Sequence, residues 1–215
     1  MKGEGHNTGS IYHVVTRSIS GYKVFNSDDD FKRIVQAFRY YQDKEDKVSL
    51  SEFLNRGKLF LDGGRSCNLE NLRVHIIAFC VMPTHLHLIL KQIEDRGISE
   101  FMGKVLNSYS RYFNLKHNRK GPLWEARFKT IPVVTDEQLI HLTRYVHLNP
   151  VTAYIAERPE DWRASSYNEF IDDVKGEDNL NFNGITMEPR QYKSFVEEYI
   201  PYQRAYAKIK NLVCE

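Results

Sequence analysis

Cysteine is scarce in this 215-residue chain, and long apolar runs are absent. The three cysteines, Cys67, Cys80 and Cys214, are odd in number, lie far apart and form no C-x-x-C pair, so the sequence supports neither a disulfide framework nor a thiolate zinc site. The longest apolar run, Ile76 to Met82, is far shorter than the roughly 20 residues that span a bilayer. The opening MKGEGHNTGS also lacks the apolar core of a secretion signal. We therefore expect a cytoplasmic protein with no membrane partner.

The small net charge of +2 conceals an uneven distribution of charged residues. Between Lys104 and Lys129 there are seven basic residues against one acidic residue, whereas between Glu157 and Glu198 eleven acidic residues stand against five basic ones. A composition of 41% hydrophobic and 27% charged residues is typical of one globular domain with a small appendage. We place the main domain at residues 1–171 and an acidic C-terminal tail or small helical subdomain at residues 172–215.

Hydrophobic periodicity predicts an α+β fold. Pro83-Thr84 separates two apolar runs of strand length, which indicates a hairpin. Pro132 indicates that its strand lies at a sheet edge. Residues 43–71 read as an elaborated connection, and Pro150 predicts that a well-delimited helix ends at Asn149. Strands are expected over residues 11–17, 72–82, 85–91 and 126–134, and helices over residues 28–42, 98–116, 136–149 and 191–200.

A strand with alternating character carries two histidines. In HLHLIL the side chains of His85 and His87 point to one face, and Leu86, Leu88 and Leu90 point to the other. Two imidazoles that project in parallel can place two nitrogens on one divalent ion. The alternative is a solvated strand face that happens to carry histidines, and this motif alone does not decide between the two.

The basic centre of the chain is interleaved with aromatic residues, a composition suited to single-stranded nucleic acid. Phosphate contacts are expected from six residues of this segment, and Tyr109, Tyr112, Phe113, Trp124 and Phe128 add stackable rings. The alternative is a solvated helix face whose aromatic residues pack inward, and at least one of Tyr109, Tyr112 and Phe113 is expected in the core. The six expected phosphate contacts are Arg111, Lys116, Arg119, Lys120, Arg127 and Lys129.

The sequence DEQLIHLTRYVHLNP predicts a helix that opens with a capping box at Thr135. At about 100° per residue, Tyr145 and Asn149 lie some 40° apart and border the buried stripe on the same side. His147 lies about 200° from Tyr145, so we discount it as a ligand. Taken alone, Tyr145 is more often an ordinary tyrosine at the edge of a core than a functional residue.

Three motifs in order resemble a known family. The stretch MPTHLHLIL, the later GPLWEARFK, and RYVHLNP with a following SSY are similar to the REP-associated tyrosine transposases, a branch of the single-strand tyrosine transposases within the His-hydrophobic-His endonucleases. The opening IYHVVTRSISGYKVF resembles the first strand of that family, and the likeness runs from about Ile11 to about Ile171. Each motif is weak by itself, and the specificity comes from their order.

The resemblance implies a mostly antiparallel central sheet with helices packed on it, a ferredoxin-like or RRM-like core. It implies that His85, His87 and Asn149 hold Mg²⁺ or Mn²⁺ and that Tyr145 is the nucleophile that forms a 5′-phosphotyrosine with DNA. The implied partner is single-stranded or hairpin DNA, bound by a monomer or a homodimer. No G-x-x-x-x-G-K-[ST] motif occurs, in agreement with strand transfer that needs no ATP.

Two other classes of function stay open at this stage. A DNA-binding protein could keep the scaffold and its basic groove without covalent chemistry. An RNA-binding module on a similar open sheet would carry stacking aromatic residues on the strands, where this chain carries histidines. Tyr109 and Tyr112 are the fallback nucleophiles if their helix turns them toward the basic region.

Overall fold

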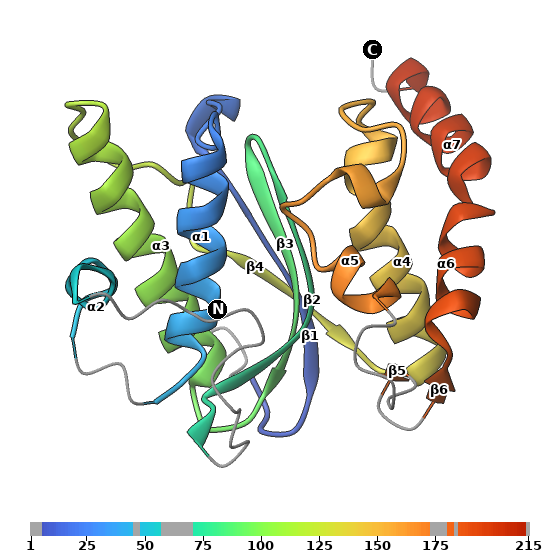
Figure 1. Ribbon diagram of the computed structural model, residues 1–215, viewed down its shortest axis with the longest axis horizontal. Coiled ribbons are helices and arrows are strands. Elements are labelled where there is room, and N and C mark those ends of the chain that lie inside the picture. Colours follow the sequence, from blue (N-terminus) through green and yellow to red (C-terminus); the bar gives the residue numbers. More distant parts are fainter. Residues whose placement is uncertain (1–5, 45–47, 57–70, 173–179, 183–184, 214–215) are drawn as a thin grey trace. The chain divides into compact units, whose positions relative to one another are not determined.

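A computed structural model describes residues 6–44, 48–56, 71–172, 180–182 and 185–213. Helices and strands are interspersed along the chain, and Figure 1 labels them. The strands are β1 (Ile11–Arg17), β2 (Val74–Met82), β3 (His85–Gln92), β4 (Lys129–Val133), β5 (Leu180–Phe182) and β6 (Ile185–Met187). The helices are α1 (Asp28–Tyr41), α2 (Leu50–Asn55), α3 (Gly97–Lys116), α4 (Asp136–Thr152), α5 (Tyr167–Ile171), α6 (Pro189–Glu197) and α7 (Ile200–Val213), with 3₁₀ turns η1 (Ile19–Gly21) and η3 (Pro159–Asp161).

The chain divides into two compact units, and each is described by itself. The first unit comprises residues 1–77 and 83–132, and the second comprises residues 78–82 and 133–215. The predicted functional boundary at residue 171 is a different division of the chain and stays a prediction. Within the described residues, no helix combines the length and the apolar character that crossing a bilayer requires.

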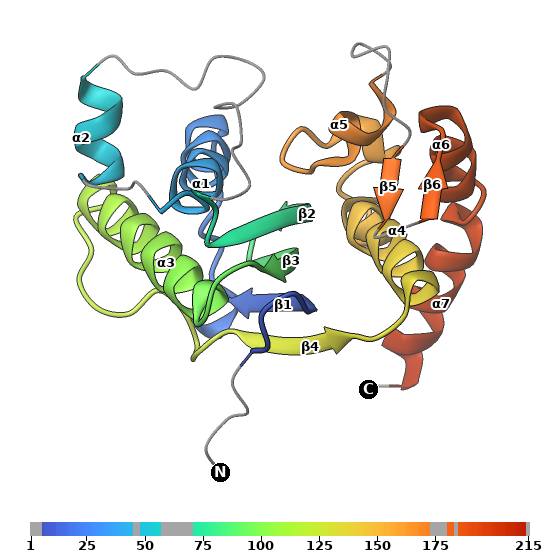
Figure 2. The same cartoon turned by 90° about the horizontal axis from the view of Figure 1, so that it is seen from below.

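A four-stranded sheet with the order β2-β3-β1-β4 is the framework of the fold (Figure 2). β1 pairs antiparallel with β3, and β3 follows β2 through the tight Pro83-Thr84 connection, as the sequence predicted. β4 lies at the edge of the sheet, where the missing N–H of Pro132 breaks no interior ladder. The predicted α+β fold with a mostly antiparallel sheet is confirmed.

Helices α1 and α3 lie side by side against one face of this sheet (Figure 1). Ser27 caps α1 because its hydroxyl accepts a hydrogen bond from the N–H of Asp30, whose carboxylate accepts the N–H of Ser27 in return. Leu86, Leu88 and Leu90 have no exposed surface, as expected for the face that the helices cover. The helices contribute to this core with Ile34, Phe38, Phe101, Val105 and Phe113.

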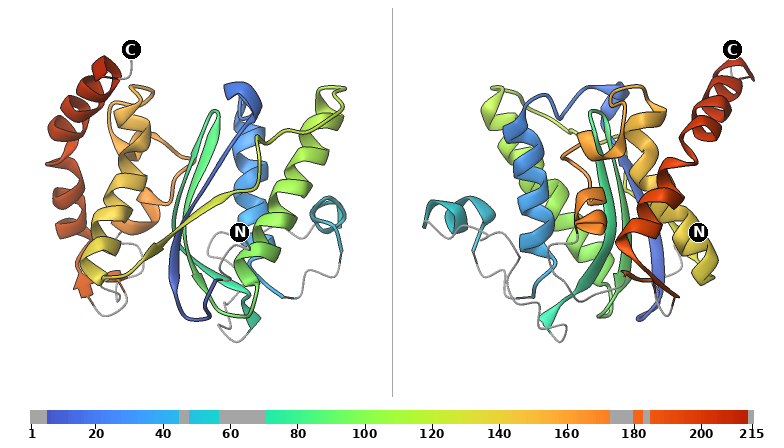
Figure 3. Two further views of the ribbon diagram at one scale, coloured as in Figure 1. Left: turned by 180° about the vertical axis from the view of Figure 1, so that it is seen from behind. Right: turned by 45° about the vertical axis from the view of Figure 1, so that its right-hand side comes forward.

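In the second unit, α6 and α7 pack along α4 (Figure 3). The helix predicted over residues 191–200 is present as α6, whose Tyr192 and Val196 are fully buried four residues apart. Helix α7 was not predicted. Besides these two buried residues, Lys193 of α6 pairs with Glu160 across 2.8 Å and joins the helix to η3.

Other boundaries differ from prediction by small amounts. The strand expected over residues 126–134 is shorter, since β4 spans Lys129–Val133. Helix α3 begins at Gly97, where a Cβ atom would collide with the carbonyl oxygen of Arg73. The connection expected over residues 43–71 contains the short helix α2, and its residues 45–47 and 57–70 lie outside the described part of the chain, as do Cys67 and Cys214.

Candidate functional site

The two predicted metal ligands on β3 stand side by side on one face of the sheet. The rings of His85 and His87 have centroids 5.0 Å apart and lie nearly perpendicular, at 78°. In the antiparallel register, Arg17 of β1 lies opposite His85 and Val15 lies opposite His87. His85 is half-buried, and His87 keeps 6% of its surface exposed. The alternation read from HLHLIL is therefore present in the folded strand.

A third histidine belongs to the same face, and sequence reasoning missed it. His13 lies on β1 two residues before Val15, so the register places it diagonally across from His87. Its Nε2 lies 3.1 Å from Nδ1 of His87 in a buried hydrogen bond, and the two rings stack at a centroid distance of 5.3 Å. The alternation of IYHVVTR shows which face of its own strand His13 shares, but its neighbour on β3 depends on the register.

The imidazole of His85 has a partner of its own. Its Nδ1 lies 2.9 Å from the hydroxyl oxygen of Thr84, the residue just before it in the hairpin connection. Each of the two predicted ligands therefore uses Nδ1 for a contact inside the protein, and Nε2 takes no part in either bond. This is the arrangement that a metal-binding histidine needs, with one nitrogen held and the other presented to the ion.

Burial keeps this histidine face uncharged. It lowers the pKa of His13 to about 4, and burial together with the charge of Arg17 lowers the pKa of His85 to about 4. The pKa of His87 falls well below its ordinary value through burial, with smaller contributions from the charges of His85, His13 and Arg17. Neutral imidazoles carry the lone pair that a metal requires, so no proton has to leave when a cation binds near pH 7.

The donor set fits a divalent cation in part. Two neutral imidazoles on adjacent strand positions can share one ion, but among the described residues no group of three or more His, Cys, Asp or Glu side chains could hold a metal. His13 faces the Nδ1 atom of His87 and does not join the pair as a third ligand. The remaining coordination positions call for a ligand of another type, such as an amide oxygen, water or a phosphate oxygen.

Helix α4 carries the predicted nucleophile and the predicted third ligand. The hydroxyl of Thr135 caps the helix by accepting the N–H of Gln138, which is one half of the predicted capping box. The side chain of Gln138 accepts the N–H of Val134 where the box requires that of Thr135. Tyr145 has 40% of its surface exposed, and Asn149 is half-buried one turn later. A nucleophile must be reachable from solvent, and Tyr145 meets that condition.

The prediction that α4 ends at Asn149 was wrong, because the helix continues through Pro150 to Thr152. A proline lacks the N–H that would bond to the carbonyl oxygen of residue 146. The side chain of Asn149 replaces that donor, since its Nδ2 donates to the carbonyl oxygens of Tyr145 at 2.9 Å and Val146 at 3.3 Å. The amide oxygen of Asn149, the atom that could bind a cation, takes no part in these two bonds.

A buried polar cluster holds α4 in the second unit. His147 has no exposed surface, and its Nδ1 lies 2.7 Å from the hydroxyl of Tyr192 on α6 while its Nε2 lies 2.9 Å from the hydroxyl of Ser166. Burial lowers the pKa of His147 to about 3. Both nitrogens are committed to protein partners, so the prediction that His147 is not a metal ligand agrees with its position.

A second contact joins α4 to the C-terminal helices. The guanidinium of Arg144, the residue before Tyr145, lies over the ring of Tyr199 at 3.7 Å and over that of Phe195 at 4.3 Å. The helix that presents Tyr145 is thus held on one flank by Arg144 and in its interior by His147. The predicted metal ligands His85 and His87 lie in the first unit, and Tyr145 and Asn149 lie in the second.

Comparisons with known proteins agree with the motifs. Residues 66–149 match the IS200-like transposase family. This stretch of the chain is therefore similar to IS200-like transposases. The matched range holds all four predicted catalytic-site residues, together with β2, β3, α3 and β4, and it ends within α4.

Two relatives extend the comparison beyond residues 66–149. A Haemophilus influenzae protein described as a REP-associated tyrosine transposase is 26% identical over 118 residues, which cover 50% of this chain and 65% of that protein, just under two thirds of its length. The solved structure of a REP-associated tyrosine transposase bound to a REP hairpin has a similar fold, with a TM-score of 0.53 and 13% identity over 80% of this chain and 84% of that one. The resemblance seen in the motifs is confirmed.

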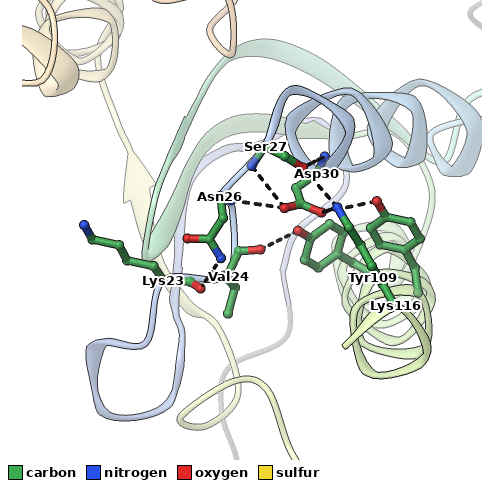
Figure 4. Close-up of polar contacts among 8 residues, drawn as sticks. Lys23, Val24, Asn26, Ser27, Asp30, Tyr109 and Lys116 are labelled. Atoms are coloured by element: carbon green, nitrogen blue, oxygen red, sulfur yellow. Dashed lines mark hydrogen bonds and ion pairs between the residues drawn. The ribbon is translucent and has the colours of Figure 1, made fainter. Parts of the chain in front are cut away.

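The six predicted phosphate contacts fall into two groups by whether they already have a partner among the described residues of the protein. Arg111, Lys120, Arg127 and Lys129 are exposed. Lys116 instead pairs with Asp30, a carboxylate with 1% of its surface exposed, across 2.7 Å, and it also donates to the hydroxyl of Ser27 (Figure 4).

Arg119 also has partners inside the protein. It donates to the side-chain oxygen of Asn114 and to the carbonyl oxygens of Gly121 and Pro122, and so closes the loop after α3. Two of the six predicted phosphate contacts, Lys116 and Arg119, therefore already have anionic or carbonyl partners.

The two fallback nucleophiles, Tyr109 and Tyr112, are poorly placed for attack. Tyr109 has 1% of its surface exposed and donates its hydroxyl proton to the carbonyl oxygen of Val24 (Figure 4), and burial raises its pKa. The half-buried Tyr112 donates to the carboxylate of Asp30, and burial raises its pKa as well. With Phe113 also buried, the expectation that this aromatic group contributes to the core is confirmed.

Proposed function

We propose that this chain is a metal-dependent single-stranded DNA endonuclease and strand transferase that cleaves near hairpins through a 5′-phosphotyrosine intermediate. The observation that carries the proposal is the histidine pair on β3, with the two rings side by side and both Nδ1 atoms held by protein partners. The similarity of residues 66–149 to IS200-like transposases supports the reaction class. The hairpin bound by the structural relative supports the choice of substrate.

In this mechanism His85, His87 and the amide oxygen of Asn149 would hold Mg²⁺ or Mn²⁺. The bound ion would polarise a non-bridging oxygen of the scissile phosphate and offset the negative charge that grows in the transition state. Asn149 suits this role because its amide nitrogen is occupied by backbone carbonyls, which leaves the oxygen as its donor atom. The mechanism requires the two units to bring these ligands together.

Tyr145 performs the covalent step. Its phenolic oxygen attacks phosphorus and releases its proton to solvent, the bond from phosphorus to the 3′ oxygen breaks, and that oxygen takes up a proton to become a free 3′-hydroxyl. The new phosphotyrosine is itself a phosphodiester, so a second 3′-hydroxyl can reverse the step and join strands without ATP. In-line attack needs the tyrosine oxygen and the metal at one phosphate.

DNA binding is assigned to the exposed cations of the basic segment. Arg111, Lys120, Arg127 and Lys129 are proposed to contact phosphates, which gives binding that weakens with salt. Lys116 and Arg119 are proposed to hold the end of α3 and the following loop, where Lys120 lies. A monomeric or dimeric state and a cytoplasmic location stay predictions.

The test is a search for a covalent protein–DNA adduct. Wild type and Tyr145→Phe are incubated with end-labelled hairpin-containing single-stranded DNA and Mn²⁺, then separated on denaturing gels. We expect an adduct in wild type that is absent in Tyr145→Phe, with Tyr112→Phe as the matched control that keeps it. Salt-sensitive binding with no adduct on any hairpin would favour the non-catalytic DNA-binding alternative, and efficient competition by RNA of the same sequence would favour an RNA-binding module.

A further inference from the structure

His13 and Thr84 each contact one histidine of the pair, and neither has a role in the mechanism above. Nε2 of His13 lies 3.1 Å from Nδ1 of His87, and the hydroxyl oxygen of Thr84 lies 2.9 Å from Nδ1 of His85. The two contacts come from different elements, β1 and the hairpin connection, yet both end on the same atom type. All four residues belong to the first unit.

The chemistry of an imidazole ties these contacts to metal binding. A neutral ring carries one proton, so a nitrogen that binds a cation must leave the proton on the other nitrogen. If Nε2 of His85 and His87 are the metal-binding atoms, both Nδ1 atoms are N–H donors and each needs an acceptor. A hydroxyl oxygen and a deprotonated imidazole nitrogen are both acceptors, and they stand where acceptors are required.

We propose that His13 and Thr84 are positioning residues that hold His87 and His85 in the tautomer with the proton on Nδ1 and orient both rings to present Nε2 to the metal. In this arrangement Nδ1–H of His87 donates to Nε2 of His13, which carries its own proton on Nδ1. Nδ1–H of His85 donates to the Thr84 hydroxyl. The inference rests on the proposed metal site and adds to it the two residues that preorganise it.

Packing alone does not account for both contacts. His13 is 7% exposed and could be a core residue that happens to reach a neighbour. Thr84, however, is a half-buried residue of the two-residue hairpin connection, and its hydroxyl reaches the ring of the next residue. At both proposed ligands an acceptor faces Nδ1. A metal site requires this arrangement at each ligand, whereas packing alone gives no reason for it to occur twice.

Two pairs of variants separate the roles. His13→Leu and Thr84→Val remove the acceptor at similar volume, whereas His13→Gln and Thr84→Ser retain one. Each is made in full-length Tyr145→Phe protein, which cannot form the adduct, and is titrated with Mn²⁺ by calorimetry. We expect Kd to rise about 10- to 100-fold for Leu and Val and to stay within about threefold of the parent for Gln and Ser. Thermal unfolding and circular dichroism confirm that each variant is folded.

A second readout needs no metal. Nitrogen-15 NMR of the histidine rings in the apo protein reports which nitrogen carries the proton. We expect Nδ1–H at His85 and His87 in the parent, loss of that preference at His87 in His13→Leu, and loss at His85 in Thr84→Val. If His13→Leu fails to fold, Thr84→Val still tests the argument in the hairpin connection.

The outcomes distinguish this inference from the proposed function. Parent protein that binds Mn²⁺ while folded Leu and Val variants bind it equally well would overturn the positioning role and leave the metal site in place. Gln and Ser variants as weak as Leu and Val would overturn the acceptor argument. Parent protein that binds no Mn²⁺ would overturn the metal site of the proposed function, and the NMR tautomers alone would then show whether the acceptors still hold the protons on Nδ1.

Discussion

The two units hold their helices with different kinds of polar contact. In the first unit, α3 is joined to α1 by the ion pair of Lys116 and Asp30, in which the lysine side chain keeps 33% of its surface exposed. In the second unit, α4 is held by His147 between Tyr192 and Ser166, all buried and uncharged. Burying a charge is costly, so the charged contact reaches the surface while the neutral one lies in the interior.

The same contrast separates the histidines of the two units by function. Both nitrogens of His147 bond to protein hydroxyls, so this residue has no donor atom left for a metal. In the contacts described, His85 and His87 each use Nδ1, and the two rings lie together on one strand face. The proposed function makes these two residues metal ligands and leaves His147 with a structural role.

The largest predicted effect is the loss of Mn²⁺ affinity when His85 and His87 are both removed. The double variant His85→Ala/His87→Ala is expected to weaken Mn²⁺ binding by at least about 100-fold and to abolish the covalent adduct, because it removes both imidazole donors. His147→Gln is the matched control, since it should cost stability but leave Mn²⁺ affinity unchanged. Calorimetric titration with Mn²⁺ measures both. Equal loss of affinity in His147→Gln would refute the division between structural and ligand histidines.

The charged contact of the first unit can be broken at its exposed partner. Lys116→Met is expected to lower the free energy of unfolding by about 2–3 kcal/mol, because it leaves the carboxylate of Asp30 buried without its cation. Lys120→Met, an exposed lysine in the same segment, should change stability by less than about 0.5 kcal/mol. Urea titration gives both values.

Salt dependence of DNA binding gives the opposite ranking of these two lysines. Lys120→Met should reduce the slope of log affinity against log salt by about 0.7, the share of one single-strand phosphate contact. Lys116→Met should leave the slope unchanged, because its charge is already paired with Asp30. A reduced slope in Lys116→Met would return Lys116 to the set of phosphate contacts.

Local periodicity predicted much of the candidate site, because the relevant residues are close in sequence. The period of two in HLHLIL placed His85 and His87 together, and the helical period placed Tyr145 and Asn149 on one side and His147 on another. Backbone geometry determines which side chains share a face of one strand or one helix. The packing of other segments therefore does not change which of these residues lie together.

Contacts between segments that are distant in sequence could not be predicted from local periodicity. His13 and His87 are 74 residues apart, and Asp30 and Lys116 are 86 residues apart. Strand register and helix packing create both contacts, and neither leaves a periodic trace in the sequence. The local pattern therefore predicts a surface cation at Lys116 and gives no signal at His13. Pro150 misled for another reason, since the donor that replaces its missing N–H is the side chain of the preceding residue.

The smallest predicted effect is a difference in pH dependence between the two contacts. His147 titrates at about pH 3 in the folded protein and near 6.5 when unfolded, so below pH 6.5 the unfolded chain binds the extra proton. Stability from His147 is therefore complete above pH 6.5 and falls by up to about 1.4 kcal/mol for each unit below it. The lowered pKa of Asp30 affects stability only below its ordinary value of 3.8.

Between pH 6.5 and 5.5, His147→Gln should lose less stability than wild type by about 1 kcal/mol, whereas Lys116→Met should lose as much as wild type. Urea titrations at the two pH values measure this, with the histidines of the first unit common to all three proteins. An unchanged slope in His147→Gln would mean that His147 can take up a proton in the folded protein, and the neutral, buried contact would then have to be abandoned.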